Sequence, residues 1–231
     1  MKMPSPNWLA ELPRNRLIAE YSMWSADLLR LAEDLARIEG HADVLHVDVA
    51  DGHFAPALLF FPDLVARMRS ASTLPIHVHL MVADAVLVEQ AAQFADAGAD
   101  LISIHAENAA VADEALALIR SRNVAAGIVL RVETEVAACR PYLDRVDFLT
   151  LLGTAIGVKG QGLDATAGDR LRQAASLIAA SGRRIVLAAD GGIRENTVPL
   201  LRAAGAETVV MGSLAFGADD LTARMRWLHA V

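Results

Sequence analysis

The sequence predicts a single-domain (β/α)₈ TIM barrel. Short apolar runs alternate with longer amphipathic segments eight times along 231 residues, close to the typical length of about 250 residues for this fold. The runs are almost continuously apolar, as in parallel strands whose sheet is covered on both faces. An open doubly wound sheet would show the same alternation, but no glycine-rich dinucleotide-binding motif follows the first run. The closed barrel is therefore the favoured fold.

Each predicted strand is rich in aliphatic or β-branched residues. The eight strands are Leu17–Ser22, Val44–Asp48, Ile76–Leu80, Leu101–His105, Ala125–Leu130, Phe148–Leu152, Ile185–Ala189 and Thr208–Met211. The segments between them have apolar residues at helical spacing. The predicted helices are Ser25–Ile38, Pro62–Arg69, Asp84–Ala97, Asn108–Arg122, Thr134–Tyr142, Asp164–Ala180, Glu195–Ala203 and Ala218–Ala230.

Local signals predict where some helices begin and end. Ser25 and Asp84 stand where a side chain would cap the free N–H groups of a first helical turn. Gly98, Gly182 and Gly205 follow predicted helices, where a left-handed glycine commonly ends a helix. The glycines therefore separate the helices from the strands that follow.

Charge and cysteine content limit the partners and the compartment. The chain has 21 Lys and Arg against 28 Asp and Glu, a net charge of −7, which argues against nucleic acid or an anionic membrane as a partner. The single cysteine, Cys139, cannot form a disulfide within the chain, so we expect a cytoplasmic protein. No signal peptide or membrane span is expected. We expect residues 1–16 to form an N-terminal arm and residues 17–231 to form the barrel.

Four potential metal ligands fall at the C-terminal ends of predicted strands, where barrel enzymes place their active sites. His46 and Asp48 are two residues apart and therefore point to the same side of one strand, His79 ends another strand, and Asp190 follows the seventh. Two imidazoles and two carboxylates suit Zn²⁺, Fe²⁺ or Mn²⁺. Each residue alone fits a hydrogen-bonded core or turn position equally well, but their convergence favours a metal site.

Other polar residues near these ends have two interpretations each. His105 and Glu107 share a strand face and would form either a polar layer behind the site or a purely structural pair. His77 has the same parity as His79, and we expect it to be a hydrogen-bonded interior residue. His53 is expected to brace its own turn.

Glycine clusters after three neighbouring strands predict a phosphate pocket. Gly191 and Gly192 follow the seventh strand, Gly212 and Ser213 follow the eighth, and Gly157 and Gly160 follow the sixth. Loops after strands seven and eight of such barrels often bind phosphate through backbone N–H groups, and glycine lets the backbone approach the anion closely.

Six segments carry a resemblance to a known family. They are YSMWSADLL (21–29), LHVDVADGHFAP (45–56), HVHLMV (77–82), AGADLISIHAE (97–107), ADGGI (189–193) and AGAETVVMGSLAF (204–216). Together they resemble the ribulose-phosphate 3-epimerase family over nearly the whole chain from Leu17. The resemblance implies a ribulose-phosphate-binding barrel and an isomerase of carbohydrate metabolism, a racemase or epimerase of the pentose phosphate type.

The resemblance also implies roles for individual residues. It implies one divalent metal ion per subunit, bound by His46, Asp48, His79 and Asp190, with Asp48 and Asp190 as the catalytic acid and base. The remaining implied roles are in substrate binding, with Met81 packed against the reacting carbons. The substrate-binding set is Ser22, His79, Met81, Gly157, Gly160, Gly191, Gly192, Gly212 and Ser213.

The implied reaction inverts C3 of a ketose phosphate through an enediolate, with ribulose 5-phosphate and xylulose 5-phosphate as the expected pair. One carboxylate on each face removes and returns the proton, while the metal ion acts as a Lewis acid. An allulose-6-phosphate or tetrulose-phosphate 3-epimerase is the alternative. A ketose-phosphate lyase or synthase fits less well, because no strand end offers a catalytic Lys, and a non-catalytic sugar-phosphate-binding barrel would not need the Asp pair. We also expect a homo-oligomer.

Several residues depart from the family pattern. Ala50 and Leu152 stand where Met is usual, Ala57 where Asn is usual, and His77 where Asp is usual. Arg131 replaces an Asn after the fifth strand, and the loop 155–161 reads AIGVKGQ in place of Asn-Pro-Gly-Phe-Gly-Gly-Gln. Arg131 and this loop predict a narrower pocket and a changed substrate preference, although Arg131 would equally fit a surface ion pair with Glu133 or Glu135.

Overall fold

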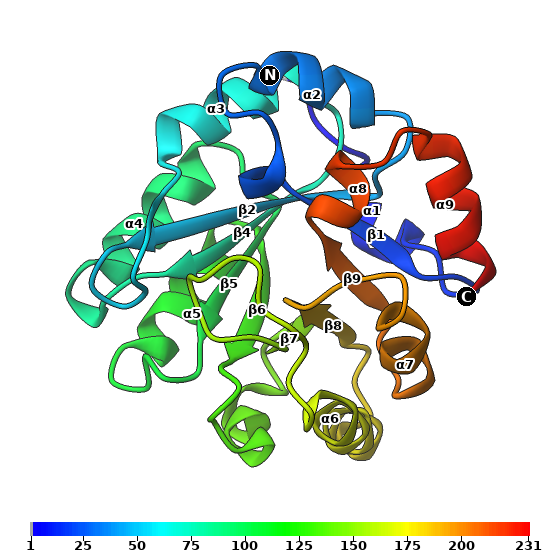
Figure 1. Ribbon diagram of the computed structural model, residues 1–231. Helices are drawn as coiled ribbons and strands as arrows, with labels where there is room; N and C mark the ends of the chain where they lie inside the picture. Colours follow the sequence, from blue (N-terminus) through cyan, green and yellow to red (C-terminus); the bar gives the residue numbers. More distant parts are fainter. Residues whose placement is uncertain (1) are drawn as a thin grey trace.

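A computed structural model describes residues 2–231 and shows a closed parallel barrel surrounded by helices (Figure 1). Its strands are β1 (Ile18–Ser22), β2 (Val44–Asp51), β3 (Leu58–Leu59), β4 (Ile76–Met81), β5 (Leu101–His105), β6 (Ala125–Leu130), β7 (Phe148–Leu152), β8 (Val186–Asp190) and β9 (Thr208–Met211). They are hydrogen-bonded in the order β1-β9-β8-β7-β6-β5-β4-β2, and the pairing of β1 with β2 closes the ring. Only β3, which pairs with the end of β2, is antiparallel among the described strands. The predicted TIM barrel is confirmed.

The helices lie around the outside of the ring (Figure 1). They are α1 (Trp8–Glu11), α2 (Leu31–Ile38), α3 (Pro62–Ala71), α4 (Asp84–Asp96), α5 (Ala112–Ser121), α6 (Ala167–Ser181), α7 (Val198–Ala203), α8 (Ser213–Phe216) and α9 (Leu221–Ala230), with 3₁₀ helices η1 (Met23–Ser25) and η2 (Val136–Tyr142). The main core lies between the strands and these helices. Within residues 2–231, no helix combines the length and apolar character that crossing a membrane requires.

The strand bounds were predicted from the sequence more accurately than the first residues of the helices. Four strands have the predicted bounds, whereas β2 continues to Asp51 and the short β3 and α8 were not predicted. Both predicted caps were wrong. Ser25 ends the 3₁₀ helix η1, and α2 begins only at Leu31. Ala83 occupies the N-cap position of α4, so the Asp84 carboxylate is free to accept a hydrogen bond from Asn108 Nδ2 at 2.7 Å in the next loop.

Two further helix predictions changed for local reasons. The segment after β6 is the 3₁₀ helix η2, because Pro141 lies inside it and lacks the N–H that an α-helix would need there. Gly182 does end α6 in the left-handed conformation, with φ of 67°. The C-terminal glycine signal was therefore more reliable than the side-chain caps.

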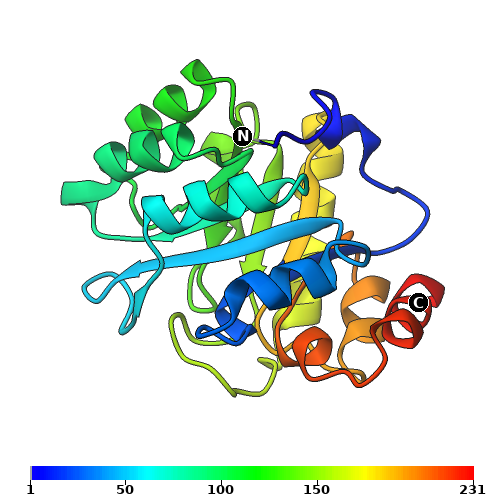
Figure 2. The ribbon, with the colours of Figure 1, turned by 90° about the horizontal axis from the view of Figure 1, so that it is seen from above.

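The N-terminal segment packs against the end of the barrel where the strands begin. Trp8, Leu9 and Leu12 contact an apolar layer built from the first residues of the strands, including Ile18, Val44, Leu101, Phe148 and Val186. Figure 2 shows this segment in dark blue at one end of the barrel and the loop after β7 in yellow-green at the other. The division into an arm (1–16) and a barrel (17–231) stays a prediction.

Above this apolar layer the barrel interior becomes polar. Glu20, His46, His77, Ser103 and Thr208 are fully buried there. A parallel barrel directs alternate side chains of every strand inward, so these residues from β1, β2, β4, β5 and β9 meet on the axis. The polar layer lies directly beneath the C-terminal ends of the strands, where the candidate ligands are found.

Gly127 makes room for this polar layer. A Cβ at position 127 would overlap Ser103 Oγ and lie 3.1 Å from Ser103 Cβ. We expect Gly127→Ala to lower the free energy of unfolding by about 1–3 kcal/mol, the usual cost of overpacking a core. Gly40→Ala is the control, because a Cβ there would meet no described atom within 4 Å. Denaturant unfolding of both variants checks this, and equal stability of the two would contradict it.

Candidate active site

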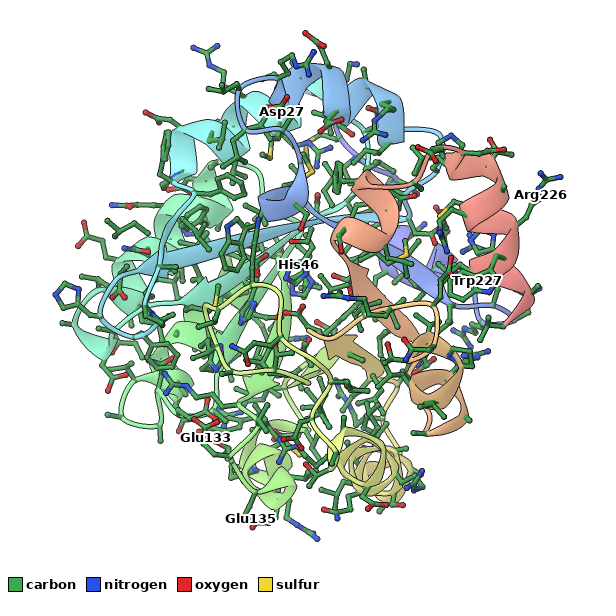
Figure 3. All side chains as sticks on the ribbon, viewed as in Figure 1. Asp27, His46, Glu133, Glu135, Arg226 and Trp227 are labelled. Carbon is green, nitrogen blue, oxygen red and sulfur yellow. The ribbon has the colours of Figure 1, made fainter. Side chains whose placement is uncertain are left out.

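Four side chains from three strands meet at the C-terminal end of the barrel. His46 and Asp48 come from β2, His79 from β4 and Asp190 from β8, and one ligand atom of each lies within 4.8 Å of the others. Asp48 Oδ1 is 3.3 Å from both His46 Nε2 and His79 Nδ1, and Asp190 Oδ2 is 3.9 and 3.8 Å from the same two nitrogens. Figure 3 shows His46 inside the ring of strands. The structure thus brings the predicted ligand set together.

The hydrogen bonding of His46 fits a cation at this centre. His46 is fully buried, and its Nε2 has no hydrogen-bond partner among residues 2–231, although its Nδ1 lies 3.0 Å from Glu20 Oε2. A buried polar nitrogen without a partner costs about 1–3 kcal/mol, so an unpaired nitrogen aimed at two carboxylates indicates a ligand atom. Two imidazole nitrogens and two carboxylate oxygens are donors that Zn²⁺, Fe²⁺ and Mn²⁺ accept. The four residues therefore fit a divalent metal ion.

His79 is held from behind by a second chain of hydrogen bonds. Its Nε2 lies 2.8 Å from His105 Nε2, and His105 Nδ1 lies 2.9 Å from Glu107 Oε2. If His79 Nδ1 presents its lone pair to the centre, the proton of this ring is on Nε2 and is donated to His105 Nε2. The proton of His105 is then on Nδ1 and is donated to Glu107 Oε2. Of the two interpretations of His105 and Glu107, the polar layer behind the site is the one that the contacts support.

Burial and hydrogen bonds set the charges of this layer. Burial lowers the pKa of His105 to about 4, so this imidazole is neutral at pH 7 and its Nε2 can accept a hydrogen bond from His79. Burial alone would raise the pKa of Glu107, but hydrogen bonds from His105 and Thr134 lower it to about 2. The chain therefore ends on a carboxylate, which also accepts the Arg131 N–H at 3.0 Å.

The two aspartates differ in their affinity for protons. Burial raises the pKa of Asp190 to about 6. Asp48 is also buried, yet the charges and hydrogen bonds of His46 and His79 hold its pKa well below the usual range. Carboxyl groups with separated pKa values are typical of acid–base pairs. A divalent cation bound between them would lower both values.

A cavity of about 590 Å³ opens directly onto these carboxylates. All the predicted substrate-binding residues line it: Ser22, His79, Met81, Gly157, Gly160, Gly191, Gly192, Gly212 and Ser213. Ser22 Oγ donates to Asp48 Oδ2 at 3.0 Å, so this hydroxyl joins the cavity wall to the carboxylate. The structure places these residues around one space, while their roles toward a substrate stay predictions.

Close backbone packing explains the glycines after β8 and β9. Gly191 and Gly192 have φ of 87° and 71°, and a Cβ at Gly192 would lie 2.7 Å from Leu163 Cα. A Cβ at Gly212 would lie 2.5 Å from Ser25 Oγ. Only glycine lets these segments run together along the cavity wall, where their backbone remains within reach of a ligand.

Arg131 does not narrow the cavity as predicted. Its guanidinium lies 4.1 Å from the centre of the Phe54 ring and donates to the Phe54 carbonyl at 2.9 Å, and it approaches Glu133 at 4.0 Å. Figure 3 shows Glu133 and Glu135 at the outer edge of the molecule. Arg131 therefore fastens the loop after β2 to the end of β6, and it is not among the described residues that line the cavity.

Lys159, from the altered 155–161 loop, does line the cavity. Its Nζ donates to the Trp24 carbonyl at 2.5 Å and lies 4.6 Å from the centre of the Trp24 ring. The departure of this loop from the family pattern thus brings a cation to the cavity mouth.

Sequence reasoning missed Glu20 and was right about His77. His77 is an interior residue, with Nδ1 2.7 Å from Glu20 Oε2 and Nε2 2.7 Å from Ser103 Oγ. The signal that could have found Glu20 is a charged residue within a predicted buried strand, two positions before Ser22 and therefore on the same inward face. His53 braces its turn, since its Nδ1 lies 3.0 Å from the Asp51 carbonyl.

A closed parallel barrel with carboxylates and imidazoles around a cavity at its C-terminal end is the arrangement of a barrel enzyme with an acid–base site. A profile described as the ribulose-phosphate 3 epimerase family matches residues 18–216. The chain is 38% identical over 206 residues to ribulose-phosphate 3-epimerase 2 of Cupriavidus necator, covering 86% of this chain and 84% of that protein. It is 36% identical to ribulose-phosphate 3-epimerase of Escherichia coli K12, covering 86% and 88%. The chain belongs to the ribulose-phosphate 3-epimerase family and is an isomerase.

Solved structures of low sequence identity share the fold. A 3-keto-L-gulonate-6-phosphate decarboxylase from Vibrio cholerae superposes with a TM-score of 0.72 at 16% identity, covering 93% of this chain and 98% of that one. A 3-hexulose-6-phosphate synthase superposes with a TM-score of 0.64 at 18% identity, covering 93% and 99%. These similarities support the barrel alone.

The geometry predicts that His79→Gln weakens binding of a divalent ion. The variant removes a ligand, so the loss should exceed the roughly 10–100-fold that follows removal of a ligand's hydrogen-bond partner. Metal content per chain and competition with a chelator measure the effect. The control His53→Gln changes an exposed imidazole outside the site and should bind metal normally. Full metal affinity in His79→Gln would show that the ion, if bound, lies elsewhere.

Proposed function

We propose that this protein inverts C3 of a ketose phosphate, interconverting ribulose 5-phosphate and xylulose 5-phosphate, with one divalent ion per subunit. The observation that carries the proposal is that Asp48 and Asp190, from different sides of the barrel mouth, line the same cavity and share one group of metal-ligand atoms. The names of the relatives support the pentulose phosphate pair. A homo-oligomer and a cytoplasmic location stay predictions.

The reaction requires a proton to leave C3 on one face and return on the other. Asp48 and Asp190 act as the two bases, each with its carboxylate at the cavity wall. Ser22 orients Asp48 through its hydrogen bond to Oδ2, which leaves Oδ1 toward the imidazoles. When bound by His46, Asp48, His79 and Asp190, a divalent cation supplies Lewis-acid stabilisation of the charge that develops on the substrate oxygens. Met81, which is buried at the cavity wall, excludes water from the reacting carbons.

The phosphate group occupies the part of the cavity formed by Gly191, Gly192, Gly212 and Ser213, where backbone N–H groups are within reach. The cations at the cavity wall are Lys159 and Arg194. Because the protein as a whole has a net charge of −7, these two cations in the cavity wall support a small anion as the ligand.

A hexulose 6-phosphate or a tetrulose phosphate is the second candidate substrate. The observation that favours it is Lys159, because the altered 155–161 loop changes the cavity wall directly. A panel of ketose phosphates incubated with metal-loaded protein in D₂O tests both candidates. Deuterium incorporation at C3 identifies the substrate, and binding without exchange would favour a non-catalytic protein.

The two-base assignment predicts that Asp48→Asn and Asp190→Asn each lose epimerisation in both directions. Loss of a general acid or base typically costs about 10²–10⁴-fold in rate. Because both residues are also proposed ligands, the variants are assayed only after metal content shows that they retain the ion. C3 proton exchange without inversion would identify the surviving Asp as the base on that face. Full activity of either metal-loaded variant would refute the assignment.

The contacts of Lys159 and Arg131 predict opposite kinetic results. Lys159→Ala should raise KM roughly 10-fold, as expected for loss of a hydrogen bond to a charged group worth about 1.5 kcal/mol. Arg131→Asn should leave kcat/KM unchanged and reduce stability, because its guanidinium packs on Phe54. Steady-state kinetics on the pentulose phosphate and thermal unfolding measure these effects. An unchanged KM for Lys159→Ala would show that Lys159 does not bind the phosphate. An altered substrate specificity of Arg131→Asn would show that Arg131 does affect substrate binding.

A further inference from the structure

We propose that Glu20 is a positioning residue that fixes the His46 imidazole as a metal ligand through Nε2. This inference rests on the metal centre of the proposed function. It adds a carboxylate from β1 that lies outside the four ligands and outside the cavity lining among the described residues.

Glu20 is fully buried and surrounded by hydrogen-bond donors. Its Oε2 lies 3.0 Å from His46 Nδ1 and 2.7 Å from His77 Nδ1, and its Oε1 lies 3.0 Å from the Thr208 hydroxyl. A carboxylate flanked by two ring nitrogens and a hydroxyl accepts hydrogen bonds from them. Both imidazoles must therefore carry their proton on Nδ1.

The neighbours of His77 are consistent with this assignment. With a proton on Nδ1, His77 offers a lone pair at Nε2, and Ser103 Oγ lies there at 2.7 Å as a donor. His77 is thereby satisfied at both nitrogens while neutral. Its function in this layer is to supply Glu20 with a second donor, so that the carboxylate is held in one orientation.

The consequence for His46 is a defined tautomer. With the proton on Nδ1 and directed at Glu20, the Nε2 lone pair points toward Asp48 Oδ1 and Asp190 Oδ2, and this is the nitrogen without a hydrogen-bond partner among residues 2–231. A carboxylate that accepts the far N–H of a ligating imidazole fixes its ring orientation and raises its basicity toward the metal.

The two imidazoles of the centre are thus held by separate carboxylates. His46 faces the centre with Nε2, and its Nδ1 is hydrogen-bonded to Glu20. His79 faces the centre with Nδ1, and its Nε2 is hydrogen-bonded to His105, which contacts Glu107. His77 stands where the family that the sequence resembles has Asp, and here it supplies a second donor to the carboxylate that contacts His46. The register pairs His77 with His46 on the adjacent strand, which explains why a change at 77 bears on this ligand.

The first test uses the unmodified protein. Histidine ¹⁵N labelling with ¹¹³Cd²⁺ as the bound ion distinguishes which ring nitrogen couples to the metal and which carries a proton. We expect His46 to couple through Nε2 with Nδ1 protonated, and His79 to couple through Nδ1. Coordination of His46 through Nδ1, or an unprotonated Nδ1, would overturn the inference.

The second test measures Zn²⁺ affinity of folded variants by competition with a chelator. Glu20→Gln keeps an acceptor but removes the charge, so we expect roughly tenfold weaker binding, and Glu20→Leu removes both, so the loss should approach about 100-fold. Thr150→Val is the matched control, because it alters another buried strand residue whose hydroxyl has no hydrogen-bond partner among residues 2–231, and it should keep wild-type affinity. Thermal unfolding of the metal-free variants reports any purely structural effect.

The outcomes separate this inference from the proposed function. Wild-type Zn²⁺ affinity in both Glu20 variants would overturn the positioning role, even if they unfold at lower temperature. If these variants do not fold, the labelled wild-type protein decides. If the wild-type protein binds neither ion, the metal centre fails and the inference fails with it. If it binds metal but shows no epimerase activity, only the proposed reaction fails.

Discussion

Closure of the barrel by the parallel pairing of β1 with β2 is the constraint on which the site depends. This pairing aligns Ser22 with His46 and Glu20 with Val44, and it places the first strand between β2 and β9. Without it, Asp190 on β8 would be separated from Asp48 on β2 by the four strands β7, β6, β5 and β4. Closure lets Asp190 reach within 3.9 Å of His46 and lets Glu20 reach the same imidazole from the other side.

The polar interior shows how a core of charged groups is made stable. A buried ion pair gains little when its desolvation is counted, so each polar atom needs a partner. Glu20, His77 and Ser103 satisfy one another in sequence, and Gly127 leaves the space that the Ser103 hydroxyl requires. His46 Nε2 and the hydroxyl of the buried Thr150 on β7 have no hydrogen-bond partner among residues 2–231, and His46 Nε2 is the one that faces the two aspartates. The position of this nitrogen opposite two carboxylates is what marks it as a potential ligand atom.

Fixed imidazoles and paired carboxylates also explain why this end of the barrel suits proton transfer. The four candidate ligands come from strands, while loops supply most of the residues that line the cavity. Lys159, which lies in a loop, contributes a positive charge to the cavity lining. In this chain the candidate ligands and the residues of the cavity wall therefore come from different kinds of segment.

The sequence by itself determined the barrel, most strand bounds and the four residues that meet at the candidate site, because apolar periodicity and residue spacing can be recognised in the sequence without the tertiary structure. It did not determine the starts of α2 and α4, since Ser25 and Asp84 are used by other parts of the fold. The contacts of Arg131 and Glu20 became evident only from the tertiary structure. Whether a guanidinium reaches a cavity or stacks on Phe54, and which carboxylate lies behind His46, depend on contacts between residues 77 and 26 positions apart. Such contacts arise only when the barrel closes.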